Sequence, residues 1–248
     1  MKIVVAHLGA LDAAHRHPRH RIPMLRAGYA ASVLRAGGHS VELIDTAVHG
    51  GEQALRLAVR RARPDVLLID PRIENYTRVG PLARDLGDYA GSIIAAGAPA
   101  ESKRRELLPV GGPLRAVLGG EYEGIVEQVV AGLAANAISD IPGCTSAGAL
   151  GPREGPQAVP IADIDALPMP PHDEYARSSY EIRYPVQVRN RVKPAFVLST
   201  RGCPHACTFC SPVEMRSRFL KYRMRDVTGV LDELAWVERL GANTVYFN

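Results

Sequence analysis

Hydrophobic positions in the first half of the chain follow two alternating patterns. Short runs rich in Val, Ile and Leu are typical of strands covered on both faces. These predicted strands cover residues 2–6, 40–44, 65–70, 92–96 and 115–118. Between them apolar residues recur at helical spacing, and the predicted helices cover residues 24–35, 52–63, 79–89, 101–108 and 121–135. Because strands alternate with helices, we expect residues 1–135 to form a doubly wound α/β domain around a parallel sheet.

The periodic pattern stops in residues 136–192. Prolines there interrupt any long helix, at positions 142, 152, 156, 160, 168, 170 and 171. We interpret this stretch as an ordered or extended connector between two domains.

Regular structure resumes close to the last residues of the chain. The run at 195–199 predicts a buried strand, and apolar residues at helical spacing predict a helix over 227–240, with Asp226 as its N-cap. A further strand is predicted at 244–247. Strand, loop, helix and strand make one βαβ unit, so a second parallel architecture begins here.

Composition narrows the class of protein. With 248 residues and 46% hydrophobic positions, the chain can bury one large core or two ordinary ones. It has no apolar run of ~18 residues and no secretory leader, so we expect a cytoplasmic protein without a membrane span. The net charge of +4 comes from basic residues dispersed along helices. This bias is compatible with anionic cofactors and does not favour nucleic-acid binding.

Three of the four cysteines lie in one short stretch, STRGCPHACTFCSP, at residues 199–212. Cys203, Cys207 and Cys210 have the spacing C-x3-C-x2-C, and thiolates suit zinc or an iron–sulfur cluster. His205 is the nearby candidate for a fourth zinc ligand, but two residues from each flanking cysteine it fits a tetrahedral cage poorly. Three thiols on a four-iron cluster leave one iron open to another ligand. The spacing favours the cluster, with zinc and chance clustering as alternatives.

The stretch resembles the radical S-adenosylmethionine (SAM) signature, C-x3-C-x-aromatic-C, which follows the first strand of a barrel. The resemblance includes the small and Arg-Gly residues at 200–202 and Phe209 before the third cysteine. It implies that Cys203, Cys207 and Cys210 bind a [4Fe-4S] cluster whose open iron is chelated by SAM. The reduced cluster would then cleave SAM to methionine and a 5′-deoxyadenosyl radical. Phe209 would lie near the adenine, with ordinary loop packing as the alternative.

The first domain, combined with this loop, resembles the cobalamin-binding domain that precedes the barrel in one large radical SAM class. The matching stretches are residues 23–45, 64–70, 93–100 and 118–130, with residues 161–175 in the connector. The resemblance implies a flavodoxin-like or Rossmann-like cobalamin-binding domain at 1–135, a connector at 136–192 and the first part of a radical SAM partial barrel at 193–248.

Cobalamin contacts are expected where small residues follow the predicted strands. Gly97, Gly119 and Gly120 would let the backbone approach a corrin ring or its nucleotide tail. Ordinary βα-turn chemistry is the alternative interpretation of each glycine.

The chain departs from one common feature of cobalamin domains, the D-x-H-x-x-G motif that supplies a histidine to cobalt. Asp12 and His15 are one residue too far apart, and His49 follows the second strand instead of the first. Bound cobalamin would therefore lack a protein histidine below the cobalt. We interpret His17 and His20, with His15, as part of a solvated basic loop. A domain that has kept its shape and lost its ligand is the other explanation.

The resemblance implies an enzyme that cleaves SAM reductively and transfers a methyl group, with cobalamin, to an unactivated substrate atom. A cyclase of the anaerobic porphyrin kind is the alternative within the same architecture. Methylthio transfer to tRNA would need a further cysteine set, whereas only Cys144 lies outside the loop, where we interpret it as an unpaired structural thiol. The implied partners are a small-molecule substrate and an electron donor such as flavodoxin or ferredoxin.

The barrel portion is short for this chemistry. Residues 193–248 are a fraction of the ~200 residues of a typical α/β barrel. We therefore expect a C-terminally truncated enzyme. A separate chain that completes the barrel, or a non-catalytic cofactor-binding module, are the alternatives.

Overall fold

The computed structural model describes residues 1–9, 20–182, 192–205 and 222–247. Several sequence predictions fall outside these ranges, namely those for Asp12, His15, His17, Cys207, Phe209 and Cys210.

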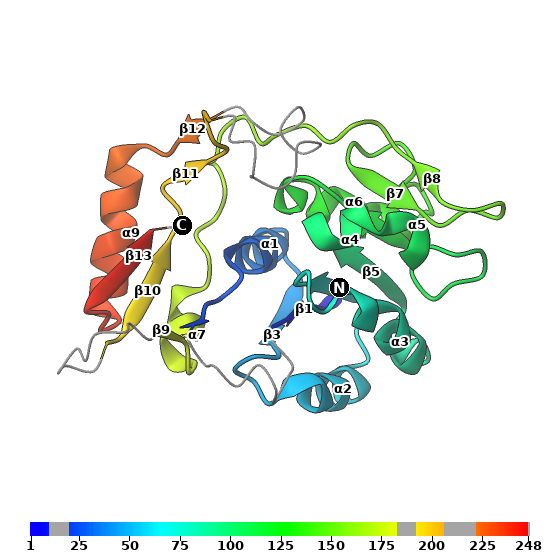
Figure 1. The fold of residues 1–248 in the computed structure, drawn as a ribbon, viewed down its shortest axis with the longest axis horizontal. Coiled ribbons are helices and arrows are strands. Elements are labelled where there is room, and N and C mark those ends of the chain that lie inside the picture. Colours follow the sequence, from blue (N-terminus) through cyan, green and yellow to red (C-terminus); the bar gives the residue numbers. More distant parts are fainter. Residues whose placement is uncertain (10–19, 183–191, 206–221, 248) are drawn as a thin grey trace.

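A seven-stranded sheet organises the larger part of the molecule (Figure 1), with the order β3-β1-β4-β5-β6-β7-β8. Its strands are β1 (Lys2–Leu8), β3 (Ser40–Asp45), β4 (Val66–Pro71), β5 (Ser92–Ala96), β6 (Ala116–Leu118), β7 (Cys144–Ser146) and β8 (Arg153–Glu154). The five strands from β3 to β6 are parallel, in the 2-1-3-4-5 order of flavodoxin-like folds. The predicted doubly wound α/β fold is confirmed.

Helices cover both faces of this sheet. One face packs against α1 (Leu25–Ala36) and α6 (Val126–Ala134), and the other against α2 (Gly51–Ala62) and α3 (Tyr76–Leu86). Successive residues of a strand point to opposite faces, so Ile3 and Val5 join the first core whereas Val4 joins the second. This explains the nearly continuous hydrophobic runs of the central strands.

Two predicted helices are broken. Residues 101–108 form part of two short helices, α4 (Ala98–Ser102) and α5 (Arg104–Leu107). The helix predicted at 121–135 begins as a separate 3₁₀ turn, η1 (Tyr122–Gly124), before α6. Tyr122 and Glu123 in this turn are buried and bind polar groups of other segments, which the helical period cannot reveal.

The stretch at 136–192 contains more regular structure than its sequence predicts. β7 and β8 extend the large sheet in antiparallel pairing, α7 covers His172–Arg177, and β9 (Glu181–Ile182) pairs with β2 (His20–Arg21). Strands of two or three residues are too short to show a period of two. Cys144 lies in β7 and is unpaired, as predicted. It is also buried, and burial raises the pKa of its thiol to about 12.

The last part of the described chain forms the predicted βαβ unit. β10 (Pro194–Val197) pairs in parallel with β13 (Thr244–Phe247), and α9 (Val227–Arg239) connects them. Asp226 is the N-cap of α9, since its carboxylate accepts a hydrogen bond of 3.0 Å from the Thr228 amide. Between β10 and α9, β11 (Thr200–Arg201) pairs antiparallel with β12 (Arg223–Met224).

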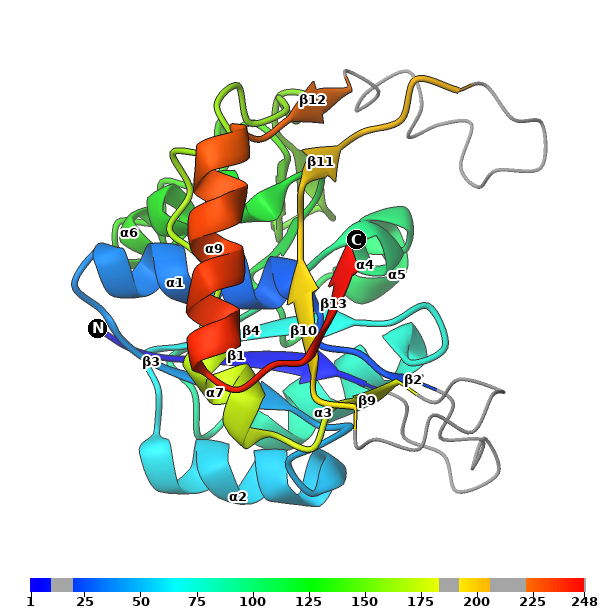
Figure 2. The ribbon, with the colours of Figure 1, turned by 90° about the vertical axis from the view of Figure 1, so that its left-hand side faces the viewer.

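This unit lies beside α1, so α1 is enclosed between it and the large sheet (Figures 1 and 2). Leu25 and Tyr29 of α1 join Tyr175, Tyr180 and Phe196 in a third hydrophobic cluster. A Cβ at Gly28 would lie 1.8 Å from the Tyr175 hydroxyl, so a glycine is required where this ring packs on α1.

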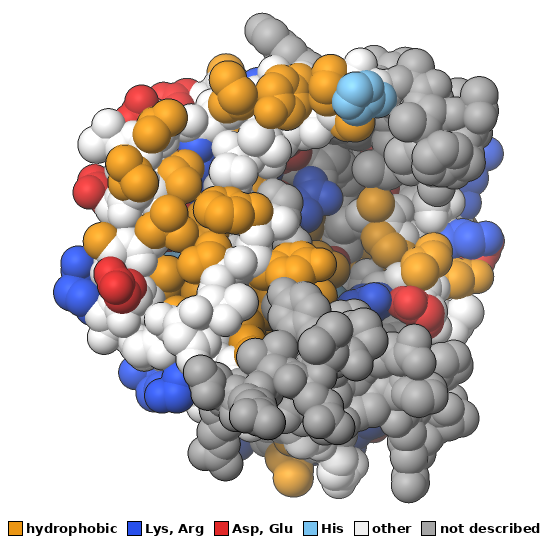
Figure 3. Space-filling model, turned by 60° about the vertical axis from the view of Figure 1, so that its left-hand side comes forward, with side chains coloured by type: hydrophobic (Ala, Val, Ile, Leu, Met, Phe, Trp, Pro, Cys, Tyr) orange, Lys and Arg blue, Asp and Glu red, His pale blue; other side chains and the backbone are white. Residues whose placement is uncertain are grey.

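The outer side of the βαβ unit is partly apolar (Figure 3). Val227 and Leu231 on α9 and Phe247 on β13 are more than half exposed. Across the described ranges, no helix combines the length and the hydropathy of a membrane span.

Candidate functional site

The parallel strands of the large sheet end at a polar edge beside the point where their order reverses, between β1 and β4. Doubly wound folds bind ligands at this position. His7 at the end of β1 donates a 2.9 Å hydrogen bond from Nδ1 to the carbonyl of Asp70, at the end of β4. The Tyr122 hydroxyl donates to Asp70 Oδ2 over 2.8 Å. Burial raises the pKa of Asp70, although His7 and Tyr122 oppose the shift.

A pocket of about 330 Å³ lies against this edge. Its polar lining includes Arg26, Asp70 and Tyr122, and its other lining includes Pro71 and Gly97. The volume is at the lower end of the range for small-ligand pockets and smaller than a whole corrinoid. The pocket therefore has room for no more than part of such a cofactor, and its lining combines apolar and hydrogen-bonding groups.

The three glycines predicted to approach cobalamin all lie at this edge. Gly97, with φ +90°, lines the pocket, and a Cβ there would lie 2.6 Å from Asp70 Oδ1. A Cβ at Gly119 would lie 2.3 Å from Cδ of Glu101, and the Gly120 amide donates to Glu101 Oε2 over 3.0 Å. Gly97 and Gly119 thus make room for carboxylates of the chain itself, and Gly120 binds one of them through its amide. Their contact with a cofactor stays a prediction.

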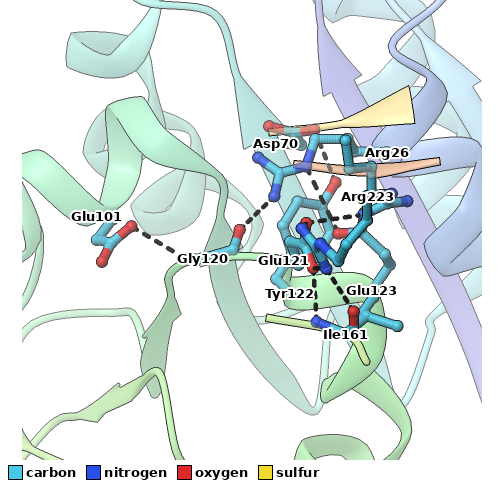
Figure 4. Close-up of polar contacts among 10 residues, drawn as sticks. Arg26, Asp70, Glu101, Gly120, Glu121, Tyr122, Glu123, Ile161 and Arg223 are labelled. Carbon is cyan, nitrogen blue, oxygen red and sulfur yellow. Dashed lines mark hydrogen bonds and ion pairs between the residues drawn. The ribbon is translucent and has the colours of Figure 1, made fainter. Parts of the chain in front are cut away.

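The segment Glu121–Tyr122–Glu123 joins this edge to the two strands that flank the cysteine loop (Figure 4). Arg223 binds Glu121 with both terminal nitrogens, at 2.5 and 2.9 Å. Arg201 pairs with Glu123 and lies 3.7 Å from Glu121 Oε1. Burial would raise the pKa of Glu121, but hydrogen bonds from Arg223 and the Ile161 amide outweigh it and lower the pKa.

The cysteine loop begins immediately after β11. Cys203 is a free, exposed thiol, and His205 two residues later is also exposed. Gly202 has φ +80°, a conformation that favours glycine at the start of the loop. The exposed thiol of Cys203, just beyond a strand end, is accessible to iron or zinc. Cys207, Cys210 and Phe209 lie outside the described residues, so the ligand set stays a prediction.

His49, the histidine after the second strand, has partners within the chain. The Asp45 amide donates to Nδ1 of His49 over 3.0 Å, and Nε2 of His49 donates to the Ser178 hydroxyl over 3.1 Å. Both ring nitrogens of His49 therefore have partners within the chain. Within the parts of the chain that the structure describes, no three His, Cys, Asp or Glu side chains converge on a metal site.

A second cluster of polar side chains links the connector to the βαβ unit. Nε2 of His172 in α7 donates to Glu233 of α9 over 2.5 Å, and both side chains are at most 2% exposed. Arg225, just before α9, pairs with the same Glu233 and with Asp165 of the connector.

Sequence reasoning did not single out the polar residues of this region. Glu121, Glu123 and Arg223 were not predicted to have a role, nor were His172 and Glu233. A signal existed for the first two, because a pair of carboxylates directly after β6 must lie at the carboxyl edge of a parallel sheet. Their arginine partners follow in sequence by about 80 to 100 residues, as the separations of 78 and 102 positions show.

Comparison with known proteins agrees with this architecture. No family model matches the chain. It is 28% identical over 231 residues to hopanoid C-3 methylase of Methylococcus capsulatus, covering 89% of this chain and 41% of that protein. It is 24% identical to the anaerobic magnesium-protoporphyrin IX monomethyl ester cyclase of Rubrivivax gelatinosus, covering 86% of this chain and 38% of the other. The chain thus spans about two fifths of the length of these relatives.

Among solved structures, the radical SAM methyltransferase TsrM of Kitasatospora setae superposes with a TM-score of 0.69 at 16% identity. The match covers 99% of this chain and 47% of TsrM, whose structure contains cobalamin and a [4Fe-4S] cluster. TsrM has also been solved with its tryptophan substrate and a SAM analogue. The sequence likenesses and the shared fold agree with the resemblance to cobalamin-dependent radical SAM enzymes that the sequence suggested. The chain is thus similar in sequence to a methylase and a cyclase, and it shares its fold with a radical SAM methyltransferase whose structure contains cobalamin.

Proposed function

We propose that the chain is the cobalamin-binding and cluster-binding part of a radical SAM methyltransferase. Cys203, Cys207 and Cys210 would hold a [4Fe-4S] cluster, with SAM at its open iron and Phe209 beside the adenine. Such a cluster supplies the electron for reductive cleavage of SAM. One observation carries the proposal: the cysteine loop leaves β11 directly against the carboxyl edge of the cobalamin-type sheet, through the Arg201–Glu123 pair.

Cobalamin would bind at the carboxyl edge of the sheet, with Gly97, Gly119 and Gly120 close to it. Arg26 and Tyr122 would contact its polar groups, because both line the pocket there. Burial at this edge excludes water from Asp70, whose carboxyl would then face the cofactor from the end of β4. The proposed division of the chain places the cobalamin domain at 1–135, with β7 and β8 added to its sheet, followed by the connector to 192 and the barrel portion at 193–248.

The substrate of the methyl transfer would be a small molecule, and the electron would come from a protein such as flavodoxin or ferredoxin. Support for methyl transfer comes from the likeness to the hopanoid methylase and to TsrM. The likeness to the anaerobic porphyrin cyclase supports ring formation as the second candidate. The exposed apolar side chains of α9 and β13 support a further polypeptide segment, in this or a separate chain, that packs on the barrel portion.

The decisive experiment is anaerobic reconstitution of the chain with iron and sulfide, followed by iron counting, electron paramagnetic resonance and a SAM-cleavage assay. We expect about four irons per chain, consistent with a cluster on three thiolates. Cys207→Ala should abolish the cluster while corrinoid binding persists. Cys144→Ala is the matched control, since this buried thiol lies outside the loop and its loss should leave the iron content unchanged.

The outcomes separate the candidate functions. Stoichiometric zinc and no four-iron cluster would overturn the central proposal. A cluster without SAM cleavage would assign the chain to the cofactor-binding module. Failure to bind any corrinoid would reduce the N-terminal domain to a scaffold.

A further inference from the structure

Two arginines stand at the base of the cysteine loop, one on each side. Arg201 is the last residue of β11 and Arg223 the first of β12, and they are register partners in the antiparallel ladder. Like charges opposite each other in a ladder are destabilising unless other groups compensate them. The compensation here comes from outside the ladder.

Glu121 and Glu123, at the carboxyl edge of the large sheet, compensate the charges of the two arginines. Arg223 binds both oxygens of Glu121, at 2.5 and 2.9 Å, and Arg201 pairs with Glu123. All four side chains are at most 9% exposed. The same Glu121 accepts a 2.6 Å hydrogen bond from the Ile161 amide, so one carboxylate contacts the connector and both flanks of the loop.

The residue between the two glutamates faces the pocket. Tyr122 is fully buried, donates to Asp70 and lies under the Arg26 guanidinium, 5.5 Å from the ring centroid. Arg26 in turn donates to the Gly120 carbonyl. The segment 121–123 thus lines the pocket through its central side chain and binds β11 and β12, the strands that flank the cysteine loop, through its outer two (Figure 4).

Buried ion pairs of this kind contribute little net stability compared with apolar packing, because desolvation offsets their attraction. Their distinctive property is that they fix orientation, because a carboxylate fixes the plane of the guanidinium that it binds with two hydrogen bonds. A cluster of four charges at this position therefore fits a role in geometry better than a role in stability.

We infer that Glu121 and Glu123 are positioning residues, which hold both flanks of the cysteine loop at a fixed separation from the pocket at the sheet edge. As far as the identity of the two cofactors is concerned, this inference rests on the proposed function. In the proposed reaction, the corrinoid and the SAM-derived radical act on the same substrate. The distance between the two cofactors therefore limits the reaction.

The first test needs no cofactor. In the full chain, hydrogen exchange of peptides covering 199–205 and 222–225 is compared with that of Glu121→Gln. We expect the amides at these flanks to exchange about tenfold faster in the variant, because the ladder opens locally. The matched control is Glu52→Gln: Glu52 is also 9% exposed and binds Arg78 and Arg56, on the far side of the sheet. Glu52→Gln should leave the hydrogen exchange of both peptides unchanged.

The second test measures the separation of the two cofactors directly. The chain is loaded with iron, sulfide and cob(II)alamin and reduced, and the magnetic interaction between the two unpaired electrons is recorded in frozen solution. We expect a single interaction strength in the parent and in Glu52→Gln, and a weakened or broadened one in Glu121→Gln at equal iron and corrinoid content. Arg223→Gln, which breaks the same pair from the loop side, should give the same result.

The results of the two tests are independent. Unchanged flank exchange in both Glu121→Gln and Arg223→Gln would overturn the inference, as would an unchanged magnetic interaction. If the parent chain takes up neither cofactor, the proposed function fails, and the exchange experiment alone decides whether the glutamates position the loop.

Discussion

The large sheet and its contact with the βαβ unit are held together by different kinds of side chain. Within the sheet, strands such as β4 are buried on both faces and the layers meet through aliphatic residues. At the contact, aromatic rings are accompanied by buried charges, including Glu123, Arg201 and Glu233. Apolar burial stabilises without specifying direction, whereas hydrogen-bonded charges specify an orientation. One region supplies the stability of the molecule and the other the relative placement of its two parts.

The largest loss of stability is expected from a substitution in the core of the large sheet. Leu68 in β4 is fully buried, and Leu68→Ala should lower the free energy of unfolding by about 2–5 kcal/mol through the cavity that it leaves. Urea unfolding followed by circular dichroism measures the change. Leu57 on α2, which is 59% exposed, is the control, and Leu57→Ala should change stability by no more than about 0.5 kcal/mol. Similar losses in both variants would refute the assignment of stability to the sheet.

An intermediate effect is expected at the aromatic contact, where two tyrosines differ in one respect. The Tyr180 hydroxyl donates to the buried Asp45 over 3.0 Å, whereas the Tyr175 hydroxyl is buried without a hydrogen-bond partner among the described residues. Tyr180→Phe should cost about 1.5–3 kcal/mol, the range for a hydrogen bond to a charged group. Tyr175→Phe should be neutral or stabilising.

Urea unfolding of both variants tests this difference, because each change removes one oxygen and keeps the ring. The ring contact between Tyr180 and Phe196, with centroids 6.4 Å apart, is retained in Tyr180→Phe. Equal destabilisation by the two substitutions would show that the hydroxyl of Tyr180 does not fasten the contact.

The smallest effect is a dependence on pH. The folded-state pKa of Glu121 is lowered, because bonds from Arg223 and the Ile161 amide outweigh its burial. Its contribution to stability is therefore complete above the ordinary glutamate pKa of about 4.3 and is lost as pH falls below that value. The groups facing it are Arg201, Arg223 and the backbone of Ile161.

Unfolding free energies of the parent and of Glu121→Gln, measured between pH 6 and pH 3, isolate this contribution. The parent should lose more stability than the variant as the solution is acidified, since glutamine does not titrate. Parallel curves for the two proteins would contradict the expected role of the Glu121 charge.

Local sequence was sufficient for the parallel strands, the βαβ unit and the cap of α9. Runs such as residues 65–70 are buried on both faces, and Asp226 is followed directly by the helix that it caps. The cysteine spacing and the stretches around it also carried the resemblance to radical SAM enzymes, because each of these motifs is contiguous in the chain. These features depend on neighbours a few positions away, which a single sequence displays.

Tertiary structure decided the rest. The short strands β7 and β8 exist because the edge of β6 is available to pair with them, and their own sequences are too brief to predict them. The partners of Glu121 and Glu123 lie 102 and 78 positions away, beyond any local pattern. From sequence alone, a charged residue is expected to lie on the solvated surface unless its partner is known. Only the folded chain brings that partner within hydrogen-bond distance. The chemistry proposed for the loop therefore rests on the sequence, whereas the attachment of its flanking strands to the sheet edge was decided by the tertiary structure.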